Sequence, residues 1–325
     1  MSVKRAVGLI SGGLDSALAA KVIKLQSIDV IGVSFVTPFV HPEVEKLAQN
    51  IDIKIEVIDI SSEYLNLVRN PRFGFGSNLN PCIDCHIFML KRARDFMLRH
   101  KANFIITGEV LGQRPMSQNK PALRKIEKES GLEGFILRPL SAQLLSWTIP
   151  EQRGWVQRSQ LFSFSGRSRK PQLELAGQLG LQGFNQPAGG CLLTDPGFSR
   201  RLRDLLTYQR EFNLDDIELL KLGRHFRVSD QAKLVLGRNQ AENQRLTGFL
   251  REGDFLMEPT GVPGPTALLR AGVISQDLIN LSAGILVRYC DQNDNQVDIS
   301  VKNGKVSRII NCSVMEHKKA EALRV

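Results

Sequence analysis

Short apolar runs alternate with helix-forming segments through the N-terminal half of the chain. The apolar runs predict strands at residues 5–10, 28–36, 54–60, 102–109 and 134–139. Between them, helices are predicted at residues 15–26, 41–51 and 83–100. A chain that alternates strands and helices in this way folds into a parallel sheet with helices on both faces. The pattern therefore predicts an α/β fold with a doubly wound parallel sheet.

The pattern changes after about residue 203. Strands and turns are predicted at residues 217–229, 231–237, 285–291, 296–303 and 305–314. The sequence KNGK at residues 302–305 is a strong hairpin signal, because Asn-Gly readily adopts the positive φ angles of a tight hairpin turn. We therefore expect two domains, residues 1–203 and a smaller α+β domain of residues 204–325. The basic tail, residues 317–325, is expected to be frayed.

The composition is that of a globular protein. Hydrophobic residues make up 42% and charged residues 23% of the 325 residues, and no run reaches the roughly 18 apolar residues of a membrane span. The N-terminal apolar run stops at Ser11-Gly12-Gly13, which is too soon for a signal peptide. Five cysteines do not make a disulfide framework in a chain of this length. We expect a cytoplasmic protein with no membrane partner.

The net charge of +10 is unevenly distributed. Residues 101–203 contain 15 Lys and Arg against 7 Asp and Glu, so +8 of the +10 lies there. Nucleic acid is the natural acidic partner of such a segment, although a merely solvated basic surface has the same composition. The candidates for phosphate contacts are Arg114, Lys120, Arg124, Lys125, Lys128 and residues 166–170.

The segment SGGLDS, residues 11–16, joins the first predicted strand to the first predicted helix. Its two glycines allow a close backbone approach, and the N–H groups of the turn and of the helix N-terminus can bind an anion. Ser11 and Ser16 add hydroxyl groups for phosphate oxygens, and Asp15 can hold Mg²⁺ or orient an attacking group. The competing interpretation is a plain glycine turn in which Asp15 caps the helix.

The spacing S-G-G-x-D-S at a first strand–helix turn matches the signature of the PP-loop ATP pyrophosphatases, which implies a fold of the adenine nucleotide alpha hydrolase type. A second motif, TGEVLGQ at residues 107–113, resembles the T-G-E-x-L-G-Q loop of the tRNA 4-thiouridine synthetases, or tRNA sulfurtransferases. LRPL at residues 137–140 resembles the next strand of that family, and the cysteine-containing stretch is similar to that of the 2-thiouridine synthetases. The resemblance spans residues 5–195. Because ligands in such sheets bind beyond the carboxyl ends of the strands, we expect the two loops to face each other.

The resemblance implies an ATP-dependent transferase that acts in tRNA processing. ATP, with Mg²⁺, would adenylate a uridine carbonyl oxygen in tRNA, because oxide is a very poor leaving group and AMP a good one; sulfur would then displace AMP. Asp15 is implied to be catalytic, and Val33 or Phe35 could contact adenine at the end of the second strand. The implied nucleotide and base site comprises Ser11, Gly12, Gly13, Asp15, Ser16, Thr107, Gly108, Glu109 and Gln113.

The sequence CIDCH at residues 82–86 places two thiols one helical turn apart. This C-x-x-C-H motif occurs in haem attachment sites, zinc sites, redox dithiols and iron–sulfur sites. Haem attachment would require export to an oxidising compartment. Zinc would require a fourth ligand, and His86 points about 100° away from Cys85 on a helix. We expect a structural role for His86 and a helix-start role for Asp84.

Cys191 follows Gly189-Gly190, where the backbone can approach a site closely. Together, Cys82, Cys85 and Cys191 resemble the C-x-x-C plus distant Cys of the cluster-dependent tRNA thiolases. The resemblance implies that these cysteines are catalytic and bind a 4Fe–4S iron–sulfur cluster whose open iron takes up sulfur, with hydrosulfide or a persulfide-carrying protein as the donor. A persulfide and disulfide mechanism remains open, as does structural zinc. Cys290 and Cys312 fall in predicted strands and are expected to be structural.

Residues 219–246 resemble the RNA-binding-type domain of the NFACT ribosome-associated proteins. By this resemblance, the RNA contacts would be Lys221, Arg224, His225, Arg227, Lys233, Arg238 and Asn239. Two other functions stay open. One is a PP-loop ligase that acts on a small molecule, of the deazaguanine type or linked to an amidotransferase. The other is a non-catalytic protein that binds RNA or the ribosome. The motifs fix neither the thiolated position, 2 or 4, nor the oligomeric state.

Overall fold

The computed structural model describes residues 3–184, 191–291, 295–304 and 306–325. The chain divides into two compact units, Met1–Thr194 and Asp195–Val325. The boundary predicted between residues 203 and 204 lies inside helix α8, Pro196–Tyr208. Among the described residues, no helix is both long and apolar enough to cross a membrane.

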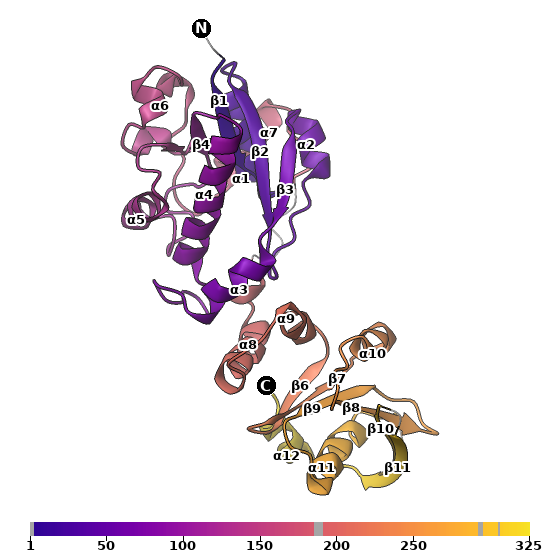
Figure 1. The fold of residues 1–325 in the computed structure, drawn as a ribbon. Helices are drawn as coiled ribbons and strands as arrows, with labels where there is room; N and C mark the ends of the chain where they lie inside the picture. The colour runs from indigo at the N-terminus through magenta and orange to yellow at the C-terminus, as the bar shows by residue number, and fades with distance from the viewer. Residues whose placement is uncertain (1–2, 185–190, 292–294, 305) are drawn as a thin grey trace. The chain divides into compact units, whose positions relative to one another are not determined.

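The first unit is built on a five-stranded parallel sheet in the order β3-β2-β1-β4-β5 (Figure 1). The strands are β1 (Arg5–Leu9), β2 (Asp29–Val36), β3 (Ile55–Asp59), β4 (Phe104–Ile106) and β5 (Ile136–Leu137). All four neighbouring pairs are parallel, which confirms the predicted α/β class. The strand order reverses between β1 and β4, so this sheet has its topological switch point there, where ligands bind in folds of this kind.

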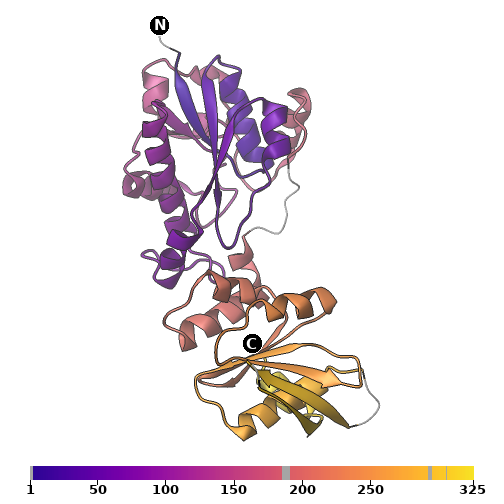
Figure 2. The same cartoon turned by 45° about the vertical axis from the view of Figure 1, so that its right-hand side comes forward.

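Helices cover both faces of this sheet (Figures 1 and 2). Its α-helices are α1 (Leu14–Lys24), α2 (Glu45–Ile51), α3 (Ser61–Arg69), α4 (Cys82–Arg99), α5 (Lys120–Ser130), α6 (Ile149–Gln152) and α7 (Lys170–Gln178). One core contains Ala6 and Phe104 together with Leu14 and Leu18 of α1. Helix α4 packs against β1, β2 and β4 and against α5, whereas α1 packs against α2 and α7. Because successive side chains of a strand point to opposite faces, the near-continuous apolar runs of β1, β2 and β4 give both faces of the sheet a core.

Helix α3 and three 3₁₀ turns were not predicted from the sequence pattern. Helix α3 begins directly after Asp59, whose carboxylate accepts a hydrogen bond from the Ser61 backbone N–H at 2.7 Å. Three 3₁₀ turns lie at Ala142–Leu144, Arg158–Gln160 and Leu192–Thr194. Segments this short do not complete the periodic pattern by which longer helices are recognised.

The second unit contains a six-stranded sheet in the order β11-β10-β8-β9-β7-β6, in which every neighbouring pair is antiparallel. Its strands are β6 (Arg224–Ser229), β7 (Ala232–Leu236), β8 (Phe255–Thr260), β9 (Ala267–Ala271), β10 (Gln296–Asn303) and β11 (Val306–Ser313). Its other helices are α9 (Leu214–Leu220), α10 (Gln240–Thr247), α11 (Gln276–Val287) and α12 (His317–Ala322). This arrangement confirms the predicted α+β domain.

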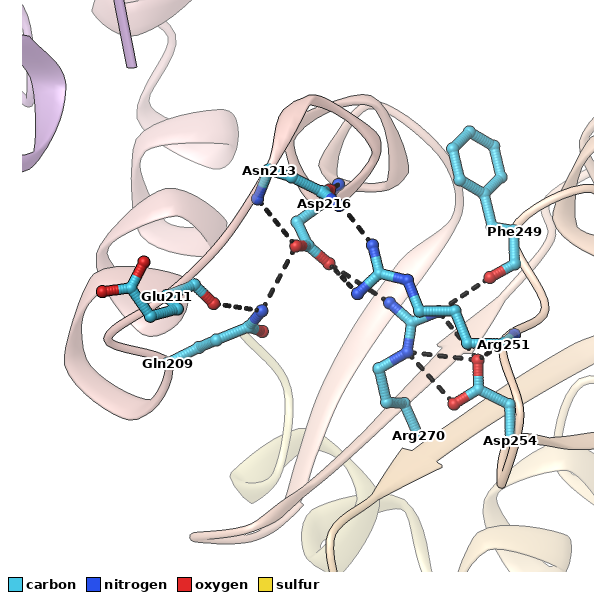
Figure 3. Close-up of polar contacts among 8 residues, drawn as sticks. All are labelled: Gln209, Glu211, Asn213, Asp216, Phe249, Arg251, Asp254 and Arg270. Carbon is cyan, nitrogen blue, oxygen red and sulfur yellow. Dashed lines mark hydrogen bonds and ion pairs between the residues drawn. The ribbon is translucent and has the colours of Figure 1, made fainter. Parts of the chain in front are cut away.

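A buried charged network ties α9 and the loop before β8 to β9 (Figure 3). The Arg270 guanidinium donates to both carboxylate oxygens of Asp254, at 2.7 Å from Nη2, and to Asp216 at 3.2 Å. Arg251 also pairs with Asp216, at 2.9 Å. The side chains of Asp216 and Asp254 are each only 4% exposed, so the arginines supply the compensating charge that burial of a carboxylate requires.

Two local predictions in the second unit were wrong. Residues 285–291 were predicted as a strand, but Ile285, Leu286 and Val287 end helix α11, where all three are fully buried. The basic tail is not frayed: the Val325 N–H donates to the His225 carbonyl at 2.9 Å, and residues 317–322 form α12. An apolar run that is buried on every side lacks the period that separates strand from helix.

Candidate active site at the carboxyl ends of β1 and β4

The SGGLDS segment forms an open turn between β1 and α1. Gly12 has a φ of 79°, a conformation that favours glycine. The Ser16 hydroxyl donates to the Gly13 carbonyl at 2.8 Å and accepts from the Ser11 N–H at 3.2 Å, so Ser16 closes the turn. Gly13 is the N-cap of α1, and no described side chain caps the helix there. Asp15 lies in the first helical turn instead, which excludes the interpretation of Asp15 as the cap.

The TGE loop lies directly against this turn. A Cβ added at Gly108 would be 2.5 Å from the carbonyl carbon of Asp15, so only glycine allows this approach. The contact follows from the sheet order, because β1 and β4 are neighbours and both loops leave their carboxyl ends. The expectation that the two loops face each other is confirmed by this contact.

Asp15 occupies a partly buried position among basic and polar side chains. Burial raises the pKa of its carboxyl group, and the charge of Arg169, a hydrogen bond from Gln113 and the charge of Arg114 partly offset this rise. Its Oδ1 atom is buried without a described hydrogen-bond partner, and so is Nε of Arg169. A buried oxygen and a buried N–H donor left unpaired at a phosphate-type loop fit a site for Mg²⁺ and nucleotide phosphates.

Arg169 reaches this site through a contact that no local pattern predicts. Residues around Ser165 lie beside the TGE loop, because Leu111 bridges to Ser165 and the Gly166 N–H donates to the Leu111 carbonyl at 2.8 Å. The sequence suggested Arg169 only as part of a basic RNA-binding run. The structure adds it to the neighbourhood of Asp15.

A chain of buried polar groups leads from the TGE loop to the cysteine-bearing helix. Glu109 is 7% exposed and accepts hydrogen bonds from Thr107 Oγ1 at 3.0 Å, His86 Nδ1 at 2.9 Å and Arg138 Nε at 2.9 Å. Burial alone would raise the pKa of Glu109, but Arg138 and His86 together lower it. Arg138 also pairs with Glu127 of α5. His86 therefore has the structural role that was expected, and this role fixes α4 to the TGE loop.

The thiols of Cys82, Cys85 and Cys191 come close enough to influence one another. Burial raises the pKa of each, and for Cys85 it rises to about 12, with the neighbouring Cys191 and Cys82 adding to the rise. The positive charge of Arg114 opposes the rise at all three sulfurs. The charge of Arg114 also acts on Asp15, so its guanidinium is near both the phosphate loop and the cysteines.

Tyr64 is a member of this cluster that the sequence pattern did not reveal. It lies in α3, is 2% exposed, and forms a hydrogen bond with the Cys85 thiol that lowers the pKa of Cys85. Its ring packs against Phe39 and Phe88, with centroids 5.8 and 6.2 Å away. A buried tyrosine hydroxyl needs a partner, and here the cysteine sulfur provides it.

The segment that carries Cys191 is anchored on both sides of the site. The Thr194 hydroxyl and N–H donate to the Cys191 carbonyl at 2.6 and 2.8 Å. Asn78 Nδ2 donates to the Thr194 carbonyl at 2.7 Å, and the Leu192 N–H donates to the Phe39 carbonyl at 3.5 Å. This anchoring brings a residue 106 positions beyond Cys85 to the same place. Gly189 and Gly190, which were expected to permit the approach, lie outside the described residues.

The cysteines do not form a closed metal site. All five cysteines of the chain are free thiols. Among the residues that the structure describes, no three His, Cys, Asp or Glu side chains are arranged so that they could hold a metal ion. The Asp84 carboxylate binds the preceding loop, where it accepts hydrogen bonds from the Arg72 and Phe73 backbone N–H groups at 3.0 and 2.9 Å. Cys290 follows α11 rather than lying in a strand, and Cys312 is buried in β11.

The other predicted contacts separate into exposed and internal groups. Lys120, Arg124, Lys125 and Lys128 lie on the exposed face of α5. Val33 is fully buried and Phe35 is 7% exposed, so neither side chain presents an open face to adenine.

In the second unit, most of the predicted RNA contacts serve the fold. His225 is 1% exposed and bonds to the Leu222 carbonyl at 2.7 Å. Arg227 and Lys233 both bond to Asp204 at 2.7 Å, and burial lowers the pKa of Lys233 to about 8 despite this pairing. The remaining residues are also engaged: Lys221 pairs with Glu218, Arg238 with Glu242, Asn239 caps α10, and Arg224 lies over the Tyr289 ring.

Two family models match the chain. Residues 1–143 match the model described as thiamine biosynthesis protein (ThiI), and residues 223–324 match the NFACT protein RNA binding domain. These matches confirm the two resemblances that the motifs indicated, one in each unit.

Among curated proteins, the chain is similar to tRNA-specific 2-thiouridylases, MnmA. The chain is 29% identical over 179 residues to that of Karelsulcia muelleri, which covers 49% of this chain and 45% of the relative. It is 27% identical over 173 residues to that of Geotalea uraniireducens, which covers 45% of each. The chain thus spans about half the length of these two relatives.

Among solved structures, a 4-thiouridine synthetase–RNA complex with bound ATP is 18% identical and has a TM-score of 0.35; the match covers 55% of this chain and 51% of that one. The C-terminal part of a fibronectin/fibrinogen-binding protein from Streptococcus suis is 11% identical with a TM-score of 0.29, and the match covers 75% and 93% of the two chains. Scores this low support no functional conclusion.

Proposed function

We propose that this protein is a cytoplasmic, ATP-dependent tRNA sulfurtransferase, which adenylates a uridine in tRNA and replaces its oxygen with sulfur at position 2 or 4. The observation that carries the proposal is the close contact between the phosphate loop and the TGE loop, at Gly108 and Asp15. The charge of Arg114 acts on Asp15 and on the three cysteine thiols, so these groups are near one another. The match to the ThiI model and the similarity to 2-thiouridylases support the same activity.

In this proposal, the residues of the first unit bind ATP and orient it for attack by the uridine oxygen. The uncapped N–H groups at the start of α1 donate hydrogen bonds to the β- and γ-phosphates, and Arg169 supplies a positive charge beside them. Asp15 would hold Mg²⁺ through its unpaired Oδ1. Attack by the uridine oxygen on the α-phosphorus forms the adenylate and breaks the bond to the departing pyrophosphate, and AMP later leaves when sulfur displaces it.

Cys82, Cys85 and Cys191 carry the sulfur in this proposal. Three cysteines are a suitable donor set for a 4Fe–4S cluster with one open iron, which would take up hydrosulfide, supplied in solution or released from a persulfide-carrying protein by a thiol reductant. The described thiols would have to converge further to bind such a cluster, because they do not yet form a metal-holding group. The chain itself contributes the anchored Cys191 segment and the Tyr64 hydrogen bond, which position two of the sulfurs.

Mass spectrometry of tRNA nucleosides tests the proposal directly. Unmodified tRNA is incubated anaerobically with the protein, Mg²⁺-ATP and sulfide, then digested to nucleosides. We expect either 4-thiouridine or 2-thiouridine, which chromatography separates, and the identity of the product decides the position. Absence of both nucleosides, with a preparation that releases pyrophosphate in response to tRNA, would contradict the sulfur-transfer step.

The same assay distinguishes the rival functions. Pyrophosphate release that is indifferent to tRNA would favour a ligase for a small molecule. Binding of RNA without any pyrophosphate release would favour a non-catalytic RNA-binding protein. The match of residues 223–324 to an RNA-binding domain is consistent with that function.

A further inference from the structure

A cavity of the first unit lies apart from the phosphate loop. It has a volume of about 250 Å³ and lies between α5, strand β5 and the segment that carries Trp147. Strand β5 is the last strand of its sheet, so one of its edges faces this space. The volume is slightly below the range of about 300–1,000 Å³ that is usual for small-molecule pockets. A space of this size suits one flat group, such as a nucleobase, better than a whole nucleoside triphosphate.

Trp147 provides a fixed aromatic surface at this cavity. Its side chain is 57% exposed, which is unusual for so large an apolar group. The Arg158 guanidinium lies 5.0 Å from the centre of its ring, and Glu151 and the Leu145 carbonyl hold that guanidinium at 2.5 and 2.9 Å. The indole is therefore supported by a side chain that is itself held in place.

The backbone on either side of Trp147 is equally constrained. Thr148 forms a capping box with Glu151 at the start of α6, and the Ile149 N–H donates to the Gly134 carbonyl at 2.8 Å. These bonds join the Trp147 segment to the turn before β5. The cavity is consequently formed before any ligand arrives, which lowers the entropic cost of binding.

Arg138 is a lining residue of the cavity, and its side chain carries an unpaired donor. The side chain is 3% exposed, and Nη2 is buried without a described hydrogen-bond partner, whereas Nε and Nη1 bond to Glu109 and Glu127. A buried N–H group left unpaired destabilises the folded protein, and an acceptor on a ligand that reaches it would remove this cost. Carbonyl oxygens and ring nitrogens of nucleobases are acceptors of this kind.

The charge around the cavity favours a phosphate-bearing ligand. The two carboxylates in its lining, Glu127 and Glu151, are already paired with Arg138 and Arg158. Lys120 and Arg124 also line it and are exposed on α5. A ligand with a flat aromatic part, hydrogen-bond acceptors and a negative backbone would satisfy all three features, and RNA combines them.

We propose that this cavity binds one unstacked nucleotide of the RNA substrate, outside the site of the reaction. The base stacks on Trp147, its polar edge accepts from Arg138, and its phosphates lie at Lys120 and Arg124. The inference deepens the proposed function and rests on it, since it takes tRNA as the ligand. Because Arg138 also bonds to Glu109 of the TGE loop, the subsite and the reaction site share one positioning residue.

Tryptophan fluorescence tests the subsite without any catalysis. The chain has two tryptophans, so a Trp155→Phe variant leaves Trp147 as the only indole. Titration with bulk tRNA, without ATP, should quench this fluorescence to saturation. Trp147→Ala should weaken tRNA binding by roughly ten-fold in a filter assay, the size expected for loss of one stacked base, while Trp147→Phe retains part of the affinity. Trp155 packs on Phe104 outside the cavity, so Trp155→Phe is the matched control and should bind like the wild type.

The outcomes separate this inference from the proposed function. If tRNA binds and Trp147→Ala binds it as tightly as the wild type, the subsite is refuted and the sulfurtransferase proposal stands. If the wild type binds no tRNA, both fail. If uridine monophosphate quenches Trp147 and tRNA does not compete with it, the cavity is a small-molecule site, and the proposal of an RNA subsite is wrong.

Discussion

Gly108 of the TGE loop lies so close to Asp15 of the phosphate loop that a Cβ at position 108 would be 2.5 Å from the Asp15 carbonyl carbon. The atoms it would meet belong to the backbone of the first turn of α1, which cannot move without disturbing that turn. Space alone therefore requires glycine here. The two motifs, about 90 residues apart in the chain, form one site because of this contact.

Replacing Gly108 with alanine should separate the two loops. Misplacing the nucleotide by a fraction of an ångström to 1 Å can lower the rate by about 100-fold, so we expect a loss of that order in tRNA-dependent pyrophosphate release. Release is measured with a coupled phosphate assay, and thermal unfolding shows whether the variant is folded.

Gly177→Ala is the control for this change. Gly177 lies within α7, and a Cβ there would meet nothing within 4 Å. Alanine is the better helix former by about 0.5–1 kcal/mol, so this variant should be equally active and slightly more stable. A folded Gly108→Ala variant with wild-type activity would show that the loops need not touch.

Cys191→Ala should separate adenylation from sulfur transfer. Cys191 lies with the other two thiols, and its loss leaves the phosphate loop and Asp15 untouched. We expect pyrophosphate release to continue and thiouridine to disappear in nucleoside analysis. Cys290→Ala, a change of a free cysteine in the second unit, should thiolate normally. Retained thiolation in Cys191→Ala would remove Cys191 from the mechanism.

The proposed cluster would have its own visible signature. Anaerobically purified protein should be brown, with a broad absorption band in the blue, and Cys82→Ala or Cys85→Ala should lose the colour. Removing iron with a chelator should abolish thiolation while pyrophosphate release continues. A colourless preparation that contains zinc and is fully active would contradict the cluster and favour the other readings of the cysteines.

Much of the active site could be predicted from the sequence because its parts are local motifs. SGGLDS and TGE each follow a strand, and the sheet order places both at one switch point. Arg169 and Tyr64 could not be assigned in this way. Arg169 lies near Asp15 because Leu111 forms a β-bridge with Ser165, and Tyr64 lies near Cys85 because α3 packs on α4. Both contacts join segments that are distant in the chain.

The roles of individual side chains in the second unit were harder to predict, because a basic residue was taken as a sign of RNA contact. Lys233 and Arg227 share Asp204, and His225 is buried beneath the end of α9. A sequence pattern does not distinguish a basic side chain that faces solvent from one that neutralises a buried carboxylate. The confirmed part was the α+β class, which depends on strand patterns rather than on individual side chains.

Arg270 should be more important for stability than an exposed arginine or lysine. Its replacement by methionine leaves Asp254 and Asp216 buried, with Arg251 as the remaining described arginine partner of Asp216 beside the hydrogen bonds from Gln209 and Asn213. Breaking a buried pair in this way costs about 3–5 kcal/mol, measured as the free energy of unfolding in urea. The control is Lys302→Met, which breaks a pair with Glu258 whose side chains are 48% and 35% exposed and should cost less than about 1 kcal/mol. Equal costs would contradict the role of the network in Figure 3.

Glu109 should make the stability of the first unit depend on acid pH. Its pKa in the folded protein lies below the ordinary value of 4.5, because Arg138 and His86 outweigh the effect of burial. A carboxylate of this kind stabilises the fold above the unfolded pKa, and its contribution falls by about 1.4 kcal/mol for each pH unit below 4.5.

Glu109→Gln should therefore cost about 3–5 kcal/mol at pH 7, where Arg138 loses a buried partner. The gap between wild type and variant should narrow in urea unfolding as the pH falls from 5 towards 3.5. Glu63→Gln is the matched control, because Glu63 pairs with Arg92 at the surface and its loss should change stability by less than about 1 kcal/mol at every pH. A gap for Glu109→Gln that stays constant across this pH range would mean that Glu109 is not held ionised by Arg138 and His86.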